Sequence, residues 1–218
     1  DPQSYERAIG RQLGGRPLTA ALKPKKEKYW RRQQDVFDAA AKVFAEKGYH
    51  GASTGDIAAE LGIAQSSLYY YFSSKDEALE RVCLNGIEGY VERLIAIARE
   101  SRPVDEKIKR AILAHIQPVI DIPDCVKSYH GERRYLPPDS RRKLGRMLAD
   151  YNDLFEEILE AGVAQGVLRN DLSCSASTLL ILAQCNAAQF WVSQPDGPDL
   201  KGMAQTIADG FLKGAINR

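Results

Sequence analysis

Apolar residues recur every three or four positions along most of this chain, a period that fits α-helices and little else. No stretch alternates apolar and polar residues as a half-buried strand would. Hydrophobic residues make up 44% of the 218 residues, as in ordinary globular proteins. We therefore predict an all-α protein. The expected helices are 29–47, 54–61, 65–72, a long one from 75 that ends before Pro103, 105–121, 139–165, 172–192 and 199–216, with short helical turns and loops over 122–138.

The segment 54–72 is predicted to be two short helices joined by a turn that contains Gly62. Ser53 and Asp56 have the spacing of a capping box, which starts the first helix. This order of helix, turn and helix is that of a helix-turn-helix. Helices this short are unstable alone, so they need a shared core. The apolar residues that can supply it are Phe37, Phe44, Ile57, Ala58, Leu61, Ile63 and Leu68.

The second short helix carries hydrogen-bonding side chains and no charge: Gln65, Ser66, Ser67, Tyr69, Tyr70 and Tyr71. Such a surface suits the major groove of DNA, where base edges present donors and acceptors, and Gln65 could bond an adenine edge twice. Three successive helical positions cover about 200° of arc, so the three tyrosines cannot all be buried. Around the start of the helix expected over 29–47, residues 23–33 hold six basic side chains and only Glu27 as an acid. Two interpretations stay open for them, a solvated tail and a minor-groove arm.

These motifs together resemble the DNA-binding head of the TetR family. The resemblance covers residues 36–79 and rests on 44–49, 56–58, 61–63, 67–72 and Ser74-Lys75. It implies a three-helix head, a dimer and a double-stranded DNA operator with near-palindromic half-sites. Leu68 and Phe72 match buried positions of the motif. The residues expected at the DNA, with Lys75 on a phosphate, are Ser53, Thr54, Gln65, Ser66, Ser67, Tyr69, Tyr70, Tyr71 and Lys75.

A weaker resemblance covers residues 129–214. It is a similarity to a subgroup of this family that regulates lipid, steroid and aromatic-acid breakdown. The matching positions are 132–138, Tyr151, 166–171, Asn186 and Trp191. The resemblance implies a small-molecule effector, an acyl-CoA thioester, and a homodimer formed through the last two helices. The candidate ligand-binding residues are Tyr129, Arg133, Arg134, Tyr151, Asn186 and Trp191.

Several features of this second half allow two interpretations. The basic cluster of residues 133–146 could clamp a phosphate or only form a solvated face. Residues 179–182 with Phe190 and Trp191 favour core or dimer interface. An amide such as Asn186 in an apolar helix needs a partner, either across a dimer or on a ligand. We expect the three histidines, His50, His115 and His130, to be structural or exposed.

We divide the chain into a basic arm (1–28), a head (29–76) and a body (77–218). A net charge of only +1 leaves DNA binding to local charge. No glycine-rich phosphate loop, metal set or paired nucleophile argues for an enzyme, a cofactor or a metal. Two alternatives are a redox or metal sensor on the same head, for which four separated cysteines offer little, and a protein-interaction module. No apolar run spans a membrane and no signal peptide is expected, so we predict a cytoplasmic protein.

Overall fold

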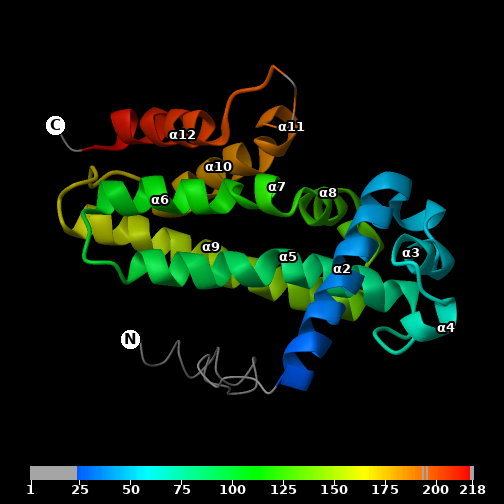
Figure 1. Ribbon diagram of the computed structural model, residues 1–218. Coiled ribbons are helices and arrows are strands. Elements are labelled where there is room, and N and C mark those ends of the chain that lie inside the picture. The colour runs from blue at the N-terminus through cyan, green and yellow to red at the C-terminus, as the bar shows by residue number, and fades with distance from the viewer. Residues whose placement is uncertain (1–23, 193, 195, 217–218) are drawn as a thin grey trace. The chain divides into compact units, whose positions relative to one another are not determined.

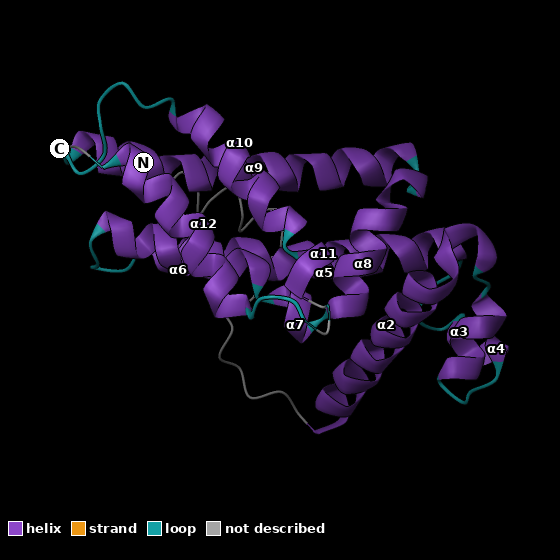
Figure 2. Cartoon of the chain, turned by 90° about the horizontal axis from the view of Figure 1, so that it is seen from above, coloured by secondary structure: helices purple, strands orange, loops and turns teal. Residues whose placement is uncertain are grey.

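The computed structural model describes residues 24–192, 194 and 196–216, which form helices joined by turns (Figures 1 and 2). Within those residues the extended pairing is limited to an isolated bridge between Leu168 and Ile216. The all-α prediction is therefore confirmed. The chain divides after Gln34 into two units, and every contact and site described below lies in the second unit. Residues 1–23 of the predicted arm lie outside the described residues, and the boundaries after residues 28 and 76 stay predictions.

Three helices begin the described chain: α2 (Pro24–Gly51), α3 (Thr54–Glu60) and α4 (Gln65–Leu68). Gly48 interrupts α2 with φ 67°, where the sequence predicts its end. The Ser53–Asp56 capping box is present at the start of α3. Gly62 in the turn before α4 has φ 63°, a left-handed conformation that a side chain would strain.

The second short helix is shorter than expected. The prediction of a helix over 65–72 is wrong after Leu68, because the chain continues in turns through Tyr71. Successive aromatic residues are weak helix formers, and the Phe72 amide bonds back to the Leu68 carbonyl at 3.4 Å. Leu68 and Phe72, 0% and 2% exposed, hold both ends of this turn in the head core. The core therefore sets the shape of the segment.

The body is a layered bundle. The helices α5 (Lys75–Ala98), α6 (Val104–Ile116) and α9 (Pro138–Ala164) pack on one another, and α10 (Cys174–Ala187) and α12 (Leu200–Ala215) pack on α6 (Figure 1). Its core joins apolar residues of all five helices, including Leu94, Ile108, Phe155, Ile181 and Ala208. In the described ranges no helix is long and apolar enough to cross a membrane.

Three predicted segments differ from the structure, the first two of them at prolines. The expected helix 105–121 breaks at Pro118, which has no amide hydrogen to continue it, so α7 (Pro118–Asp121) is separate. Residues 122–138, expected as short helical turns and loops, form the ten-residue helix α8 (Pro123–Glu132) and the 3-10 turn η1 (Arg133–Tyr135). Pro123 occupies the start of α8, where a missing amide hydrogen costs nothing. The expected helix 172–192 also divides, into α10 and α11 (Gln189–Val192).

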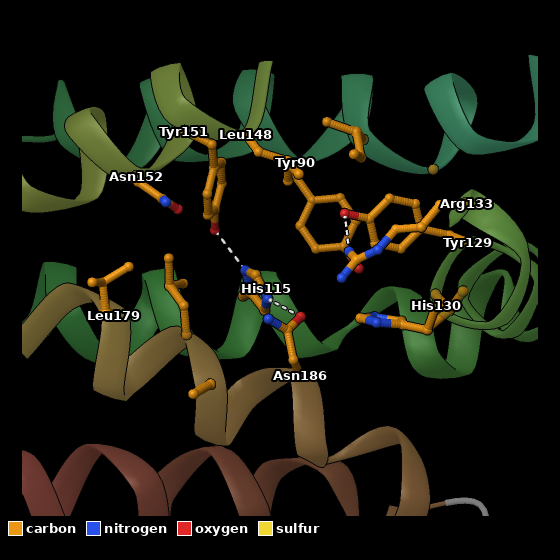
Figure 3. A pocket seen from close by; sticks show the side chains of 15 residues that line it. Tyr90, His115, Tyr129, His130, Arg133, Leu148, Tyr151, Asn152, Leu179 and Asn186 are labelled. Carbon is orange, nitrogen blue, oxygen red and sulfur yellow. Dashed lines mark hydrogen bonds between the residues drawn. The ribbon is translucent and has the colours of Figure 1, made fainter. Parts of the chain in front are cut away.

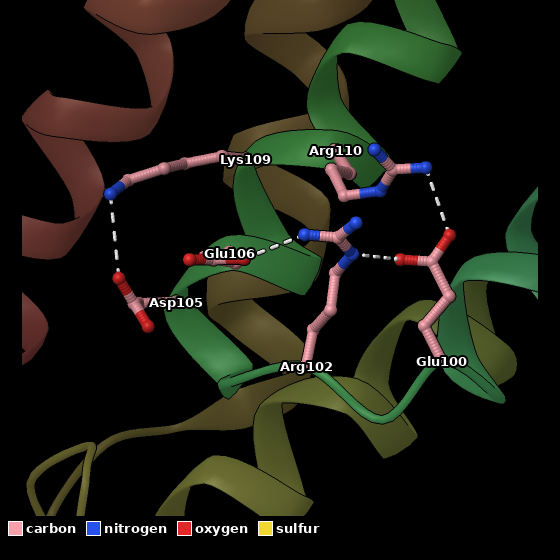
Figure 4. A network of polar contacts seen from close by, with 6 residues as sticks. All are labelled: Glu100, Arg102, Asp105, Glu106, Lys109 and Arg110. Carbon is pink, nitrogen blue, oxygen red and sulfur yellow. Dashed lines mark hydrogen bonds and ion pairs between the residues drawn. The ribbon is translucent and has the colours of Figure 1, made fainter.

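Two local features stabilise the end of the body at which α5 ends and α6 begins. A side chain at Gly162 would place its Cβ 2.8 Å from Leu168 Cδ1 and 2.9 Å from Val104 Cγ1, so only glycine allows this close packing. The loop from α5 to α6 is held by ion pairs of Arg102 with Glu100 and Glu106 (Figure 4). These pairs are partly exposed and each contributes about 0.2–1 kcal/mol.

Helix α8 connects body and head. The Ser128 hydroxyl donates to the Ala41 carbonyl at 2.8 Å, and Glu132 Oε2 accepts from the Tyr49 amide at 2.8 Å. Cys125 and Tyr129 belong to the same buried cluster as the head residues. The core of the head is therefore completed by a helix of the body.

Candidate functional site

The first candidate site is the surface formed by α4 and the turn after it. Tyr69 and Tyr70 are 51% and 73% exposed, and Gln65, Ser66 and Ser67 are exposed as well. Their neighbours Leu68 and Phe72 are buried, which fixes the backbone beneath them. The exposed side chains can donate and accept hydrogen bonds and carry no charge. We call this set, residues 65–67 with 69–70, the recognition surface.

Hydrogen bonds connect the residues around the recognition surface. Gln65 Nε2 donates to Thr54 Oγ1 at 2.8 Å, and the Ser53 hydroxyl accepts the Asp56 amide hydrogen as the cap of α3. Ser53 is therefore occupied in helix capping, while Thr54 orients Gln65. Tyr71 is only partly exposed and packs on the head core. Of the three tyrosines, Tyr71 thus packs beneath the recognition surface and is not part of it.

Lys75, expected at a DNA phosphate, bonds within the chain. Its ammonium donates to the carbonyls of Tyr49 and Ala52 at 2.8 and 2.9 Å and lies 4.4 Å from the centroid of the Tyr49 ring. The Tyr49 hydroxyl bonds Asp76, and this raises the pKa of Tyr49 to about 12. The structure therefore ties the first residues of α5 to the segment before α3.

The second candidate site is a cavity of about 260 Å³ inside the body (Figure 3). It lies among α5, α6, α8, α9 and α10. Four of the six predicted ligand residues line it: Tyr129, Arg133, Tyr151 and Asn186. The other two, Arg134 and Trp191, are not among its lining residues. The remaining lining residues are Gly86, Ile87, Tyr90, His115, Val126, His130, Leu148, Asn152, Leu179, Leu182 and Ala183.

Arg133 supplies the positive charge of the cavity. Its guanidinium donates to the Tyr129 hydroxyl at 2.6 Å and lies 4.8 Å from the centroid of that ring. Among the described residues no carboxylate forms an ion pair with it. Arg134 lies over the Tyr135 ring at 4.8 Å instead. The structure thus separates the two adjacent arginines, and only the first faces the cavity.

A polar cluster forms another part of the cavity wall. His115 Nδ1 is 2.9 Å from the Tyr151 hydroxyl, and Nε2 is 3.3 Å from Asn186 Oδ1. Burial lowers the pKa of His115 to about 4, so its imidazole is neutral near pH 7. His115 was not among the site residues expected from the sequence. A polar residue within an apolar helix, as at His115 and Asn186, was the sequence signal for this cluster. The sequence does not show that the two side chains contact each other.

The cysteines and histidines give no support to a redox or metal sensor. Burial raises the pKa of the Cys83 and Cys125 thiols to about 12 and about 11, and that of Cys185 to about 12. The thiolate is the reactive form, so these groups react poorly at neutral pH. Within the part of the chain that the structure describes, no cluster of three or more histidine, cysteine or acidic residues could hold a metal.

Large apolar side chains are exposed on α10 and α11. Leu179 and Leu180 are 57% and 65% exposed, and Phe190 and Trp191 are 64% and 55% exposed. Residues 179–182 were expected to be core or dimer interface. Ile181 and Leu182 are buried in the core, and Leu179 and Leu180 are exposed. Contiguous exposed apolar groups mark surfaces that bind another molecule.

Comparison with known proteins agrees with this arrangement. The family model described as bacterial regulatory proteins, tetR family, matches residues 36–82. That described as tetracyclin repressor-like, C-terminal domain, matches residues 101–215.

Individual relatives are similar over most of their length. The fatty acid metabolism regulator protein of Bacillus subtilis is 24% identical over 90% of this chain and 100% of its own. The transcriptional repressor KstR2 of Rhodococcus jostii is 30% identical over 65% of this chain and 70% of its own. The crystal structure of AibR in complex with isovaleryl coenzyme A and operator DNA has a TM-score of 0.71, with 21% identity over 85% of this chain and 98% of its own. Since the family models match more than half of the residues, the chain belongs to the TetR family of bacterial regulatory proteins.

Proposed function

We propose that the protein is a sequence-specific DNA-binding transcriptional regulator, a repressor that a small-molecule effector releases from its operator. The recognition surface carries this proposal: exposed amide, hydroxyl and phenol groups stand on a short segment whose backbone is fixed by buried Leu68 and Phe72. Such groups read base edges in the major groove and bond phosphates. The relatives named above are called regulators and a repressor, which agrees with this role and not with an enzyme.

Operator binding is the first test. Fluorescence anisotropy would measure binding to labelled DNA from upstream of the protein's own gene, at several salt concentrations and with competitor DNA. We expect binding that survives competitor and weakens steeply with salt, because phosphate contacts release counterions. Binding that competitor DNA removes entirely would contradict the proposal for that operator.

Gln65→Ala and Tyr70→Ala are expected to weaken operator binding by about 5- to 150-fold, since a good base contact contributes about 1–3 kcal/mol. The thermal stability of both variants should stay close to that of the wild type, because the two side chains are exposed. Lys127→Ala is the control, because this side chain is exposed on α8, away from the recognition surface in sequence, and its loss should leave operator binding normal. A large loss of stability in Tyr70→Ala would instead assign that ring to the core.

A homodimer is the second part of the proposal, formed through α10 and α12 with α11 beside them. The exposed apolar side chains of Leu180, Phe190 and Trp191 support it, because a second copy would remove them from water. Two heads would then contact two half-sites about one helical turn apart. The same anisotropy titration, performed at DNA concentrations well above the dissociation constant, should show two chains per operator.

The proposed effector is an acyl-CoA thioester or a similar amphipathic anion. The cavity combines apolar walls with Arg133, whose guanidinium suits phosphate and carboxylate oxygens. A volume of about 260 Å³ is smaller than most small-molecule sites, which suits an acyl group better than a whole thioester. The CoA moiety would then lie outside, toward the exposed basic residues that begin at Arg133. The isovaleryl coenzyme A bound by the structural relative AibR agrees with this class.

Arg133→Ala should weaken effector binding by about ten- to a hundredfold, because it removes a charge-assisted contact of about 1.5–3 kcal/mol. Arg134→Ala is the matched control: this adjacent arginine lies over Tyr135 and should leave the affinity within about twofold. Isothermal titration calorimetry with hexanoyl-CoA would measure both, and operator binding should be unchanged. Equal affinities of the two variants would remove Arg133 from the site.

Effector binding would reach the DNA through α5. This single helix contributes Ile87 and Tyr90 to the cavity and Leu79 and Val82 to the head core. Its first residue, Lys75, bonds the carbonyls that precede α3. A ligand that prefers one tilt of α5 would therefore change the separation of the two recognition surfaces in a dimer. Half-sites accept only a narrow separation, so a few kcal/mol of preference would release the DNA.

A further inference from the structure

The polar cluster of the cavity has more hydrogen-bonding capacity than its own members use. A neutral imidazole has one donor and one acceptor nitrogen. Because Asn186 Oδ1 can only accept, His115 Nε2 carries the hydrogen, and Nδ1 accepts the hydrogen of the Tyr151 hydroxyl. The three side chains therefore form one directed chain, from the Tyr151 hydroxyl through His115 to Asn186.

Two groups at the ends of this chain stay available. The Tyr151 oxygen keeps lone pairs that can accept, and the Asn186 amide keeps the two hydrogens on its nitrogen. Both residues line the cavity (Figure 3). Asn186 is also exposed to solvent. A third group is the Tyr90 hydroxyl, which also lies at the cavity and forms no hydrogen bond with the residues that the structure describes. Polar groups in a largely apolar cavity cost free energy unless a partner bonds them.

The charge of the cavity is unevenly placed. Burial holds His115 neutral, and burial lowers the pKa of His130 to about 4 as well. Among the lining residues only Arg133 is then charged at neutral pH. Figure 3 shows Arg133 with Tyr129 on one side of the cavity and Tyr151 with Asn152 and Leu179 toward the other. The two sides thus suit different groups, an anion at the first and an uncharged hydrogen-bonding group at the second.

We infer that the effector carries an uncharged oxygen, a hydroxyl or a carbonyl, on its apolar part. The Asn186 amide donates to this oxygen in either case, and a hydroxyl can also donate to the Tyr151 oxygen. The inference rests on the proposed function, since it names the class of molecule for the same cavity. A hydroxy acyl group can use both ends of the chain, whereas an oxo acyl group can only accept, from the Asn186 amide or the Tyr90 hydroxyl. A plain hydrocarbon chain would leave the Asn186 amide and the Tyr90 hydroxyl without partners, and a carboxylate would meet no positive charge here.

The test compares CoA thioesters that differ only in this oxygen: hexanoyl-CoA with 3-hydroxyhexanoyl-CoA and 3-oxohexanoyl-CoA, and benzoyl-CoA with 4-hydroxybenzoyl-CoA. Calorimetry would measure each dissociation constant with the full-length protein. We expect at least one oxygenated thioester to bind about tenfold more tightly than its parent. Asn186→Leu should reduce each such ratio to about twofold or less, and Tyr151→Phe should do so for the hydroxy thioesters, because these substitutions remove the groups that bond the oxygen. Thermal melting would show that both variants are folded.

Arg133→Ala is the control that separates the two sides of the cavity, because it should weaken both members of a pair equally and leave their ratio unchanged. Equal binding of parent and oxygenated thioesters would overturn the inference, and so would a ratio that survives both Asn186→Leu and Tyr151→Phe. It would also be overturned if none of the five thioesters bound. Operator binding is measured separately, so a protein that shows the ratio but binds no operator would contradict only the proposed function.

Discussion

Leu68→Ala is expected to lower operator affinity at least tenfold while the body still binds its ligand. Leu68 is 0% exposed and is the buried residue of the four-residue α4. Removing a buried leucine side chain costs about 2–5 kcal/mol. Helices as short as α3 and α4 have almost no stability of their own, so this loss falls on the segment that holds the recognition surface.

Anisotropy would measure the affinity of Leu68→Ala, and hydrogen exchange of the amides in 54–72 would measure local opening. Leu68→Met is the control, because it conserves volume and should cost less than about 1.5 kcal/mol. Binding of the alanine variant within twofold of the wild type would show that the recognition surface does not depend on this anchor.

Phe155→Ala is expected to destabilise the whole body. Its ring is 0% exposed and belongs to the core that joins α5, α6, α9, α10 and α12. Truncation of a buried phenylalanine costs about 3–5 kcal/mol. For a chain of this size each kcal/mol lowers the melting temperature by about 2–4 °C, so we expect a fall of roughly 6–20 °C.

Differential scanning calorimetry would measure this fall. The matched control is Ile120→Ala, an apolar side chain on α7 that is 51% exposed. It should change the free energy of unfolding by about 0.5 kcal/mol or less. If both variants melted at the same temperature, Phe155 would not be the centre of the body core.

The sequence was sufficient for the helical class and for most of the head. Helical periodicity, the Ser53–Asp56 cap and the glycine in the turn are local signals, and the structure confirms each of them. The end of α4 was mispredicted because it depends on burial of Phe72, which is a tertiary contact. The breaks at Pro118 and before α11 were missed for a similar reason, since the apolar pattern continues across both.

The cavity was predictable only in part. Tyr129, Arg133, Tyr151 and Asn186 were expected from a family resemblance, and the structure brings them together. His115 could not be found in this way, because its partners Tyr151 and Asn186 are 36 and 71 positions away. Arg133 and Arg134 are equivalent in sequence, and only the geometry of η1 separates them. Contacts between distant helices decide the site, and local patterns do not carry that information.

The contribution of α8 to the head core limits how this protein can be recombined with its relatives. Cys125 and Tyr129 complete the buried cluster of the head, and Ser128 and Glu132 bond to α2. A chimaera joined anywhere within α5 would therefore pair a foreign α8 with this head, and the Tyr49 amide would keep a partner only if that helix carried a carboxylate at the position of Glu132. A graft that changes the DNA specificity needs to carry α8 as well, and α8 brings Tyr129 and His130 of the cavity with it. A graft that transfers the DNA specificity therefore also transfers part of the effector site.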